Sequence, residues 1–144
     1  MPKRLRFCLG MKLDRIDHVG VVVADLESAR RLLEEGFGMQ CVREIHKPEL
    51  NAAFFKCGNA DVELFEILDP EMRERRLGSA RQARLEHIAI EVNDLDGLLG
   101  LLGRLGIETT GPPDVSKANT SVWTKAETSG GVMYQFLERA RPTP

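Results

Sequence analysis

The sequence repeats itself at an offset of 69 residues, about half of its length of 144. Residues 17–27 read DHVGVVVADLE, and residues 86–96 read EHIAIEVNDLD. The chemically matched pairs are Asp17/Glu86, His18/His87, Val19/Ile88, Val21/Ile90, Val23/Val92, Asp25/Asp94 and Leu26/Leu95. Solenoid units run only about 20–50 residues, so this spacing indicates one fold built from two copies of a module.

Each copy is predicted to begin with a strand, because β-branched residues dominate the repeated segment and pack well on a pleated surface. An Asp follows each strand and suits a helix N-cap, since its carboxylate accepts the free N–H groups of the first turn. The predicted helices are 26–35, capped by Asp25 and by a left-handed Gly36, and 95–105, capped by Asp94 and Gly106.

Three shorter strands are predicted after each helix, so the fold class is α+β: two tandem βαβββ modules whose strands form a curved mixed sheet around one cleft. The predicted strands are 40–45, 52–57 and 61–67 in the first copy and 107–110, 120–124 and 132–137 in the second. Residues 13–138 are then one domain, with module one at 13–68, a linker helix within 69–83 that Pro70 can open, and module two at 84–138. Residues 1–12 are interpreted as an N-terminal extension, and residues 139–144 as a tail.

Composition excludes several classes of protein. A formal net charge of −2 lacks the basic excess of a nucleic-acid binder, and no apolar run approaches the roughly 18 residues that span a membrane. Cys8, Cys41 and Cys57 are odd in number and lack CxxC spacing, which favours reduced thiols in a cytoplasmic protein. Cys41 and Cys57 are interpreted as small apolar residues in strands.

These segments resemble the vicinal oxygen chelate superfamily, which includes glyoxalase I, bleomycin-resistance proteins, extradiol dioxygenases and methylmalonyl-CoA epimerase. The resemblance covers residues 13–138 and is greatest to the methylmalonyl-CoA epimerases. The motifs that carry it are Ile16-Asp17-His18-Val19-Gly20, Leu85-Glu86-His87-Ile88-Ala89, Asp61-Val62-Glu63-Leu64 and Gly131-Val132-Met133-Tyr134-Gln135. It implies that the cleft is a metal-binding cleft in which His18, Glu63, His87 and Gln135 bind one divalent metal ion.

The residue chemistry is compatible with that set, because two imidazoles, one carboxylate and one amide oxygen suit Zn²⁺, Co²⁺, Ni²⁺, Mn²⁺ or Fe²⁺. The repeat strengthens the assignment of His18 and His87, whereas His46 has no repeat partner and is interpreted as a loop residue. The alternative to a ligand role is that Glu63 faces solvent and that Gln135 is an ordinary polar residue of a strand. Glu66 and Glu138 are the alternative ligands if the strand register differs, and Arg73, Arg75, Arg76, Arg81 and Arg84 are interpreted as a solvated face.

The resemblance implies an isomerase, epimerase or lyase that abstracts a proton beside a metal-bound carbonyl, and Glu63 is the predicted catalytic base. Two features depart from the epimerases. Their bases correspond to Gln135 and Ala52, which cannot take a proton, so Glu44 or Glu49 is considered as a stand-in. Lys125-Ala126-Glu127 stands where those enzymes carry His-Pro-Lys, so recognition of coenzyme A is not carried over.

Two other classes remain open: an extradiol-type dioxygenase, and a binding protein of the bleomycin-resistance type that performs no chemistry. The expected partner is a small molecule, an acyl thioester or an α-oxo compound, and no substrate-binding residue is assigned. A homodimer is expected, since sheet edges need covering and proteins of this superfamily commonly pair. Metal release is expected below about pH 6, because an unperturbed His titrates near pH 6.5.

Overall fold

The computed structural model describes residues 13–141, so the extension predicted at residues 1–12 lies outside the described residues, as do the last three residues of the tail. These residues form two compact units. One comprises residues 16–89, and the other comprises residues 90–141 with residues 13–15. Within the described range, no helix is long and apolar enough to cross a membrane.

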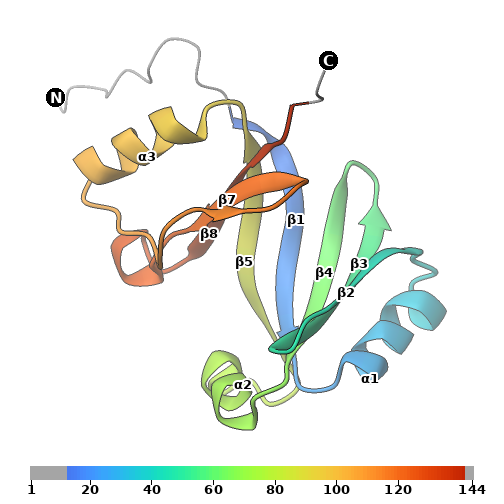
Figure 1. The fold of residues 1–144 in the computed structure, drawn as a ribbon. Helices are drawn as coiled ribbons and strands as arrows, with labels where there is room; N and C mark the ends of the chain where they lie inside the picture. Colours follow the sequence, from blue (N-terminus) through green and yellow to red (C-terminus); the bar gives the residue numbers. More distant parts are fainter. Residues whose placement is uncertain (1–12, 142–144) are drawn as a thin grey trace, which may run out of the picture. The chain divides into compact units, whose positions relative to one another are not determined.

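The chain runs through βαβββ twice, which confirms the duplicated module of an α+β fold (Figure 1). The first copy consists of β1 (Leu13–Val23), α1 (Leu26–Arg31), a π-helical turn η1 (Leu32–Gly36), β2 (Cys41–His46), β3 (Leu50–Cys57) and β4 (Ala60–Ile67). After α2 (Pro70–Leu77), the second consists of β5 (Ala83–Val92), α3 (Leu95–Arg104), β6 (Asp114–Val115), β7 (Asn119–Trp123), a short 3-10 turn η2 (Ala126–Thr128) and β8 (Met133–Arg139).

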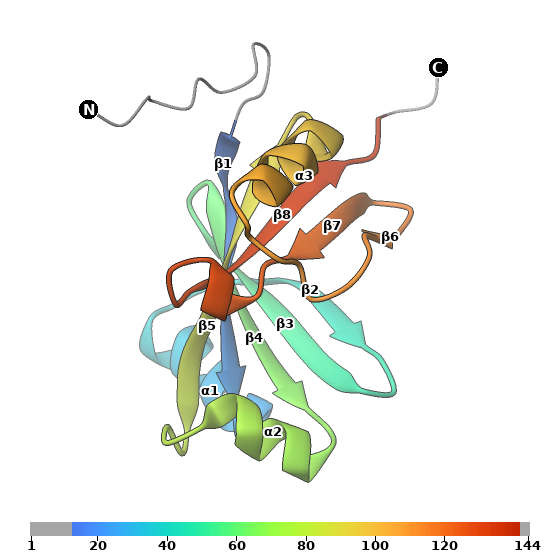
Figure 2. The ribbon, with the colours of Figure 1, turned by 90° about the vertical axis from the view of Figure 1, so that its left-hand side faces the viewer.

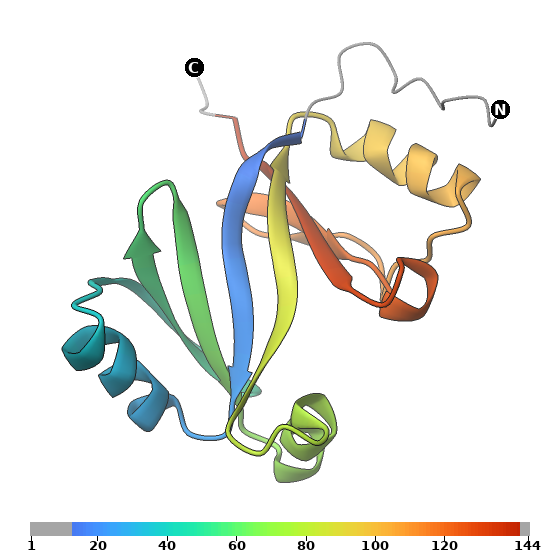
Figure 3. The same cartoon turned by 180° about the vertical axis from the view of Figure 1, so that it is seen from behind.

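In residues 16–89 the strands lie in the order β2-β3-β4-β1, with β5 beside β1. The sheet is mixed as predicted, since β1 pairs with β4 in parallel while β2/β3 and β3/β4 are antiparallel. One face packs against α1 and η1 (Figure 3), through an apolar cluster that includes Leu26, Leu33 and Phe55. The other face carries a second cluster, which Leu77 of α2 helps to cover. We call the face that packs against α1 and η1 the helix face. We call the face that Leu77 helps to cover the metal face, because the predicted metal ligands of this unit lie on it.

In residues 90–141 the order is β8-β7-β6, and the pairs are antiparallel. Helix α3 packs its apolar side against this sheet (Figure 2), with Leu95, Leu98 and Leu102 contacting Val122 and Phe136. Asp94 accepts the N–H of Gly97 at the start of α3, and Gly106 takes a φ of 73° just after its end. Both caps of the second helix are therefore as predicted.

The end of the first helix differs from the prediction, because the left-handed residue is Gly38 (φ 67°) and not Gly36. The chain widens into a π-helical turn, in which the N–H of Phe37 bonds to the carbonyl of Leu32. The N–H of Met39 then bonds to the carbonyl of Leu33 at 2.9 Å, so the chain turns back at the left-handed Gly38 and satisfies a carbonyl of the last helical turn.

The predicted strand at residues 107–110 was wrong, because only an isolated bridge from Thr109 to Thr124 forms there. Gly111-Pro112-Pro113 follows at once, and proline cannot donate a hydrogen bond to a strand ladder. Pairing resumes only in the two-residue β6. Cys41 and Cys57 both lie in strands as predicted, Cys41 half-buried at the start of β2 and Cys57 exposed at the end of β3.

Candidate metal centre

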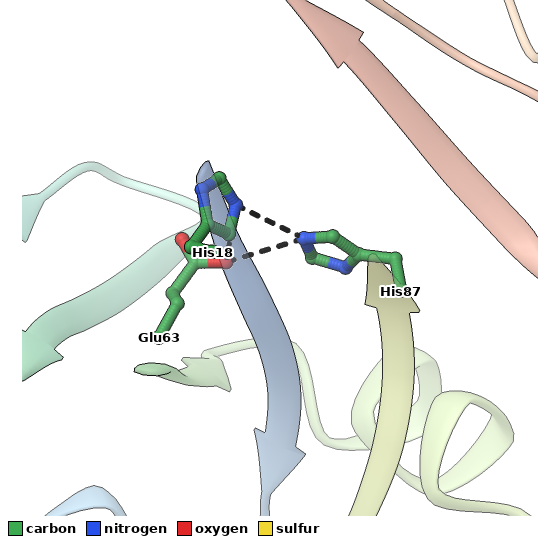
Figure 4. A group of neighbouring side chains, drawn as sticks. All are labelled: His18, Glu63 and His87. Carbon is green, nitrogen blue, oxygen red and sulfur yellow. Dashed lines mark hydrogen bonds and ion pairs between the residues drawn. The ribbon is translucent and has the colours of Figure 1, made fainter. Parts of the chain in front are cut away.

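Three side chains on the metal face of residues 16–89 converge: His18 on β1, Glu63 on β4 and His87 on β5 (Figure 4). The Nε2 atoms of the two histidines are 3.4 Å apart. Oε1 of Glu63 lies 3.4 Å from Nε2 of His87 and 3.7 Å from Nε2 of His18. Three of the four predicted ligands thus present one donor atom each to a common point.

Strand register explains how residues so far apart in sequence meet. Gly20 of β1 pairs with Glu63 of the parallel strand β4, and His18 shares a face with Gly20 because side chains alternate along a strand. β5 lies on the other side of β1. The two strands that carry the repeated histidines are therefore neighbours, and the carboxylate comes from the strand on the other side of β1.

The three donor atoms fit a divalent transition-metal ion. A circle through them has a radius of about 2.0 Å, close to the Zn–N and Zn–O distances of about 2.0–2.2 Å. Two imidazoles and one carboxylate are also ligands of the type that Zn²⁺, Co²⁺, Ni²⁺, Mn²⁺ and Fe²⁺ accept. The geometry and the donor chemistry agree, and no backbone movement is needed to bring the three together.

The imidazole of His87 occupies the space that a side chain at position 20 would fill. A Cβ atom built on Gly20 would lie 2.0 Å from Cε1 of His87 and 2.4 Å from its Nε2. Real Cβ atoms essentially never approach other atoms so closely. Glycine at position 20 is therefore what allows the ring to lie across β1 and reach the site.

Each of the two histidines has a carboxylate near its Nδ1 atom. Nδ1 of His18 donates to Oδ2 of Asp17 at 2.8 Å, and Nδ1 of His87 lies 3.4 Å from Oε1 of Glu86. A carboxylate on one ring nitrogen fixes the tautomer and leaves the other nitrogen free to bind metal. The sequence analysis assigned neither acid a role. The signal was present, because Asp17 and Glu86 are matched in the repeat.

Glu86 is in turn held by Arg76 of the linker helix α2. The guanidinium donates from Nε at 2.6 Å and from the terminal Nη2 at 2.5 Å, one bond to each carboxylate oxygen. The interpretation of the arginines in and after this helix as a solvated face therefore holds for Arg75, Arg81 and Arg84, which are exposed. It was wrong for Arg76 and for Arg73, which is half-buried and donates to the carbonyl of Ile67. The helical spacing brings Arg76 back over the sheet beside Phe65, whose ring centroid is 5.7 Å from its guanidinium carbon.

Electrostatics in the metal-free protein favour a proton on His87. Burial lowers the pKa of His87, but the hydrogen bonds to Glu63 and Glu86 outweigh burial and raise it to about 9. Burial also raises the pKa of Glu86, and its bonds to His87 and Arg76 reverse this and lower it to about 2. The imidazolium then donates from Nε2 towards Glu63 and from Nδ1 towards Glu86. That proton occupies the position a cation would take.

Aromatic rings and burial shield the site. His18 and His87 are 4% and 5% exposed, and the Glu63 side chain is 14% exposed, so the solvent-facing alternative for Glu63 does not hold. The Phe54 ring packs nearly perpendicular to the His18 ring, with centroids 5.3 Å apart. The Phe65 ring lies 5.8 Å from that of His87. Low solvent access strengthens the interaction between these charged groups.

The other predicted residues fall in different places. Gln135 is 8% exposed on β8, opposite Trp123 of β7; both belong to the unit of residues 90–141, and its ligand role stays a prediction. Glu66 accepts the N–H of Leu26 at 3.4 Å and is not part of the cluster.

The proposed stand-in base Glu44 was wrong. It forms an ion pair with Arg30 of α1, on the helix face, and this hydrogen bond lowers the pKa of Glu44. Its position follows from strand alternation, since Glu44 pairs with Ala53, a member of the helix-face cluster. Ala52, as expected, lies on the metal face without a titratable group.

Comparison with known proteins identifies the family of the chain. Residues 15–136 match the family model of the Glyoxalase/Bleomycin resistance protein/Dioxygenase superfamily. The chain belongs to this superfamily. This confirms the resemblance inferred from the motifs around His18, Glu63, His87 and Gln135.

Similar solved structures include a hypothetical protein, BH1468, from Bacillus halodurans, with 19% identity and a TM-score of 0.80 over 92% of this chain and 99% of that one. Methylmalonyl-CoA epimerase from Mycobacterium tuberculosis has 25% identity and a TM-score of 0.76 over 88% of each chain. A variant of the Streptomyces coelicolor methylmalonyl-CoA epimerase, in complex with 2-nitronate-propionyl-CoA, has 18% identity and a TM-score of 0.79, over 90% of this chain and all of that one.

A curated relative is the uncharacterized protein YqjC of Bacillus subtilis, 28% identical over 92 residues. The match covers 62% of this chain and 66% of that protein, just under two thirds of the relative's length.

Replacing Gly20 with Ala is expected to abolish tight Zn²⁺ or Co²⁺ binding, because the new methyl group displaces the His87 ring. Overpacking of this kind should also lower the free energy of unfolding by about 1–3 kcal/mol. Metal titration and urea denaturation measure the two effects. Gly103→Ala in α3, where a Cβ meets nothing within 4 Å, is the control. Wild-type metal affinity in Gly20→Ala would contradict the assigned position of His87.

Metal binding is expected to release about one proton at pH 7.5, because His87 with a pKa of about 9 is protonated in the metal-free protein and must lose that proton to become a ligand. Affinity should therefore rise with pH up to about 9, a higher range than an unperturbed histidine predicts. Calorimetric titration of Zn²⁺ in buffers with different ionisation enthalpies counts the proton. A buffer-independent heat would show that His87 is already neutral.

Glu86→Gln is expected to weaken metal binding about 10–100-fold, the usual effect of losing a carboxylate that orients a metal-binding histidine. Arg76→Met should act in the same direction with a smaller effect, since Glu86 remains but is no longer held by two hydrogen bonds. Co²⁺ affinity from visible absorption is the measurement, and Arg75→Met on the exposed side of α2 is the control. Unchanged affinity in Glu86→Gln would mean that the carboxylate does not orient His87.

Proposed function

We propose that the protein is a divalent-metal-dependent isomerase or lyase that moves a proton at a carbon next to a carbonyl, with Glu63 as the base. The observation that carries this proposal is the triangle of His18, Glu63 and His87 donor atoms, with sides of 3.4, 3.4 and 3.7 Å. Membership of the superfamily supports the proposal. Gln135 is proposed as the fourth ligand by its place in the repeat.

A divalent cation bound here acts as a Lewis acid that makes the C–H bond beside a carbonyl more acidic. His18 and His87 hold their Nε2 atoms towards the same point because Asp17 and Glu86 engage the opposite nitrogens. The Glu63 carboxylate is slightly exposed, so a substrate can reach it while most bulk water is excluded. One carboxylate oxygen takes the proton from carbon and returns it to a neighbouring atom of the same substrate.

The surroundings favour a reaction with one base. An epimerase that works on both faces of a carbon needs an acid or base on each, and Ala52 and Gln135 supply neither. Glu44 is held on the helix face by Arg30. Glu49 is exposed in the turn between β2 and β3. Isomerisation, in which Glu63 both removes and returns the proton, or elimination, in which Glu63 removes the proton while a leaving group departs from the neighbouring carbon, fits these residues better than two-base epimerisation.

The substrate is proposed to be a small carbonyl compound, an acyl thioester or an α-oxo compound. Two observations support this class: the methylmalonyl-CoA epimerases among the similar structures, and the Streptomyces coelicolor enzyme seen with 2-nitronate-propionyl-CoA. Cytoplasmic location and a homodimer remain part of the proposal.

An extradiol-type dioxygenase is the second candidate. Two histidines and one carboxylate are the ligand set of many non-haem Fe²⁺ oxygenases, and this is the set that His18, His87 and Glu63 provide. Metal analysis separates the candidates, since bound iron with consumption of O₂ favours the dioxygenase. A protein that takes up no metal favours the binding protein of the bleomycin-resistance type.

Replacing Glu63 with Gln is expected to slow proton exchange at the substrate carbon by about 100-fold or more, because an amide has no basicity while its oxygen can still bind metal. The metal-loaded protein is incubated in D₂O with methylmalonyl-CoA, with 2-oxobutyrate or with the hemithioacetal of methylglyoxal. NMR follows the incorporation of deuterium.

Glu66→Gln is the matched control, since it makes the same change on the same strand but on a residue bonded to Leu26. It should retain wild-type exchange. Full exchange in Glu63→Gln would show that the base is another group. No exchange on any of the three compounds by the metal-loaded wild type would refute the proposed reaction class.

A further inference from the structure

An arginine on the edge strand lies next to the aromatic wall of the site. The guanidinium carbon of Arg43 is 4.0 Å from the centroid of the Phe54 ring, and Phe54 packs in turn against His18. The register places Arg43, Phe54 and Glu63 in one row across β2, β3 and β4. Side chains in one such row share a face of the sheet.

A β-bulge is what turns Arg43 to this face. Cys41 pairs with Phe55 and Arg43 pairs with Phe54, so two steps along β2 match one step along β3. In a regular strand Cys41 and Arg43 would share a face, but Cys41 packs with the helix-face cluster whereas Arg43 stacks on Phe54. Bulges commonly redirect a side chain beside a functional site.

The neighbours of Arg43 agree with this change of face. Glu44, the next residue, pairs with Arg30 on the helix face, and Ile45 packs with the metal-face cluster. From Arg43 onward the strand therefore alternates regularly, with Arg43 and Ile45 on the metal side.

The guanidinium of Arg43 also has no acidic partner in the part of the chain that the structure describes. Arg30 pairs with Glu34 and Glu44, and Arg76 pairs with Glu86, whereas the Arg43 guanidinium lies over the face of the Phe54 ring. Stacking leaves the N–H groups at the edge of the guanidinium plane, where they match the two oxygens of a carboxylate.

We propose that Arg43 binds a carboxylate at the far end of the substrate whose carbonyl end is held at the cluster of His18, Glu63 and His87. This inference rests on the proposed function and names its substrate class, a carbonyl compound with a second, distal carboxylate. β2 and β4 are two strand spacings apart, about 10 Å, and the Arg43 and Glu63 side chains lie over the same row. The distance that remains between the Arg43 side chain and the cluster suits a substrate whose carboxylate is a few bonds away from its carbonyl group.

The experiment compares two ligands that differ only at the distal end. 2-Oxoglutarate and 2-oxopentanoate have the same five-carbon chain and the same α-oxo acid, but only the first ends in a carboxylate. Calorimetry with the Co²⁺-loaded protein should give about tenfold tighter binding of 2-oxoglutarate to the wild type, the effect of one charge-assisted pair. Arg43→Met should remove the preference. Arg43→Lys should keep part of it, since lysine retains charge but not the planar fork.

Arg31→Met is the matched control, because it removes the same charge from exposed α1 on the helix face and should leave the preference intact. Equal affinity of the two ligands for the wild type, binding of neither, or a preference that persists in Arg43→Met would overturn the proposal. Failure of the proposed function is recognised separately. A metal-loaded wild type that prefers 2-oxoglutarate but shows no proton exchange on any of the test compounds would keep the Arg43 site and refute only the reaction.

Discussion

The imidazole of His87 lies against the backbone of β1 at Gly20, and the candidate site depends on that close approach. Because the ring crosses the neighbouring strand, its Nε2 comes within 3.4 Å of both His18 and Glu63. A side chain at position 20 would hold the ring away from the two other donors. One missing methyl group thus decides whether the repeated histidines form a single site or two separate buried residues.

The acids behind the histidines give the site its electrostatic character. Asp17 and Glu86 each engage the nitrogen that faces away from the cluster, while Glu63 approaches from the other side. Buried carboxylates are unfavourable without compensating charge, and Arg76 supplies part of that charge to Glu86. The linker helix, which the sequence suggested was only a solvated connection, is thereby joined to the metal face. Proton and cation compete for the same position between His87 and Glu63.

The repeat predicted much of this arrangement because its residues have simple physical roles. Asp25 and Asp94 cap helices in both copies, and His18 and His87 lie on equivalent first strands. Local irregularities escaped prediction. Leu33, inside the π-helical turn before Gly38, packs in the helix-face cluster, a contact that the sequence pattern does not reveal. The strand predicted at 107–110 is interrupted by the prolines that follow it. Arg76 was missed since its partner, Glu86, is remote on the sheet, and no helical pattern reveals such a contact.

The bulge in β2 changes the face on which an edge residue lies without changing the pairing of the neighbouring strands. The backbone pairing of β3 with β4, which supports the Glu63 side of the site, does not depend on the extra residue at Val42. Without Val42, Cys41 and Arg43 would be consecutive and would still lie opposite Phe55 and Phe54, so the extra residue lets two side chains that are two positions apart lie on opposite faces. The edge strand can therefore hold a charged side chain over the metal face while the residue two positions before it packs in the helix-face cluster, and neither arrangement involves the buried histidines or their acids.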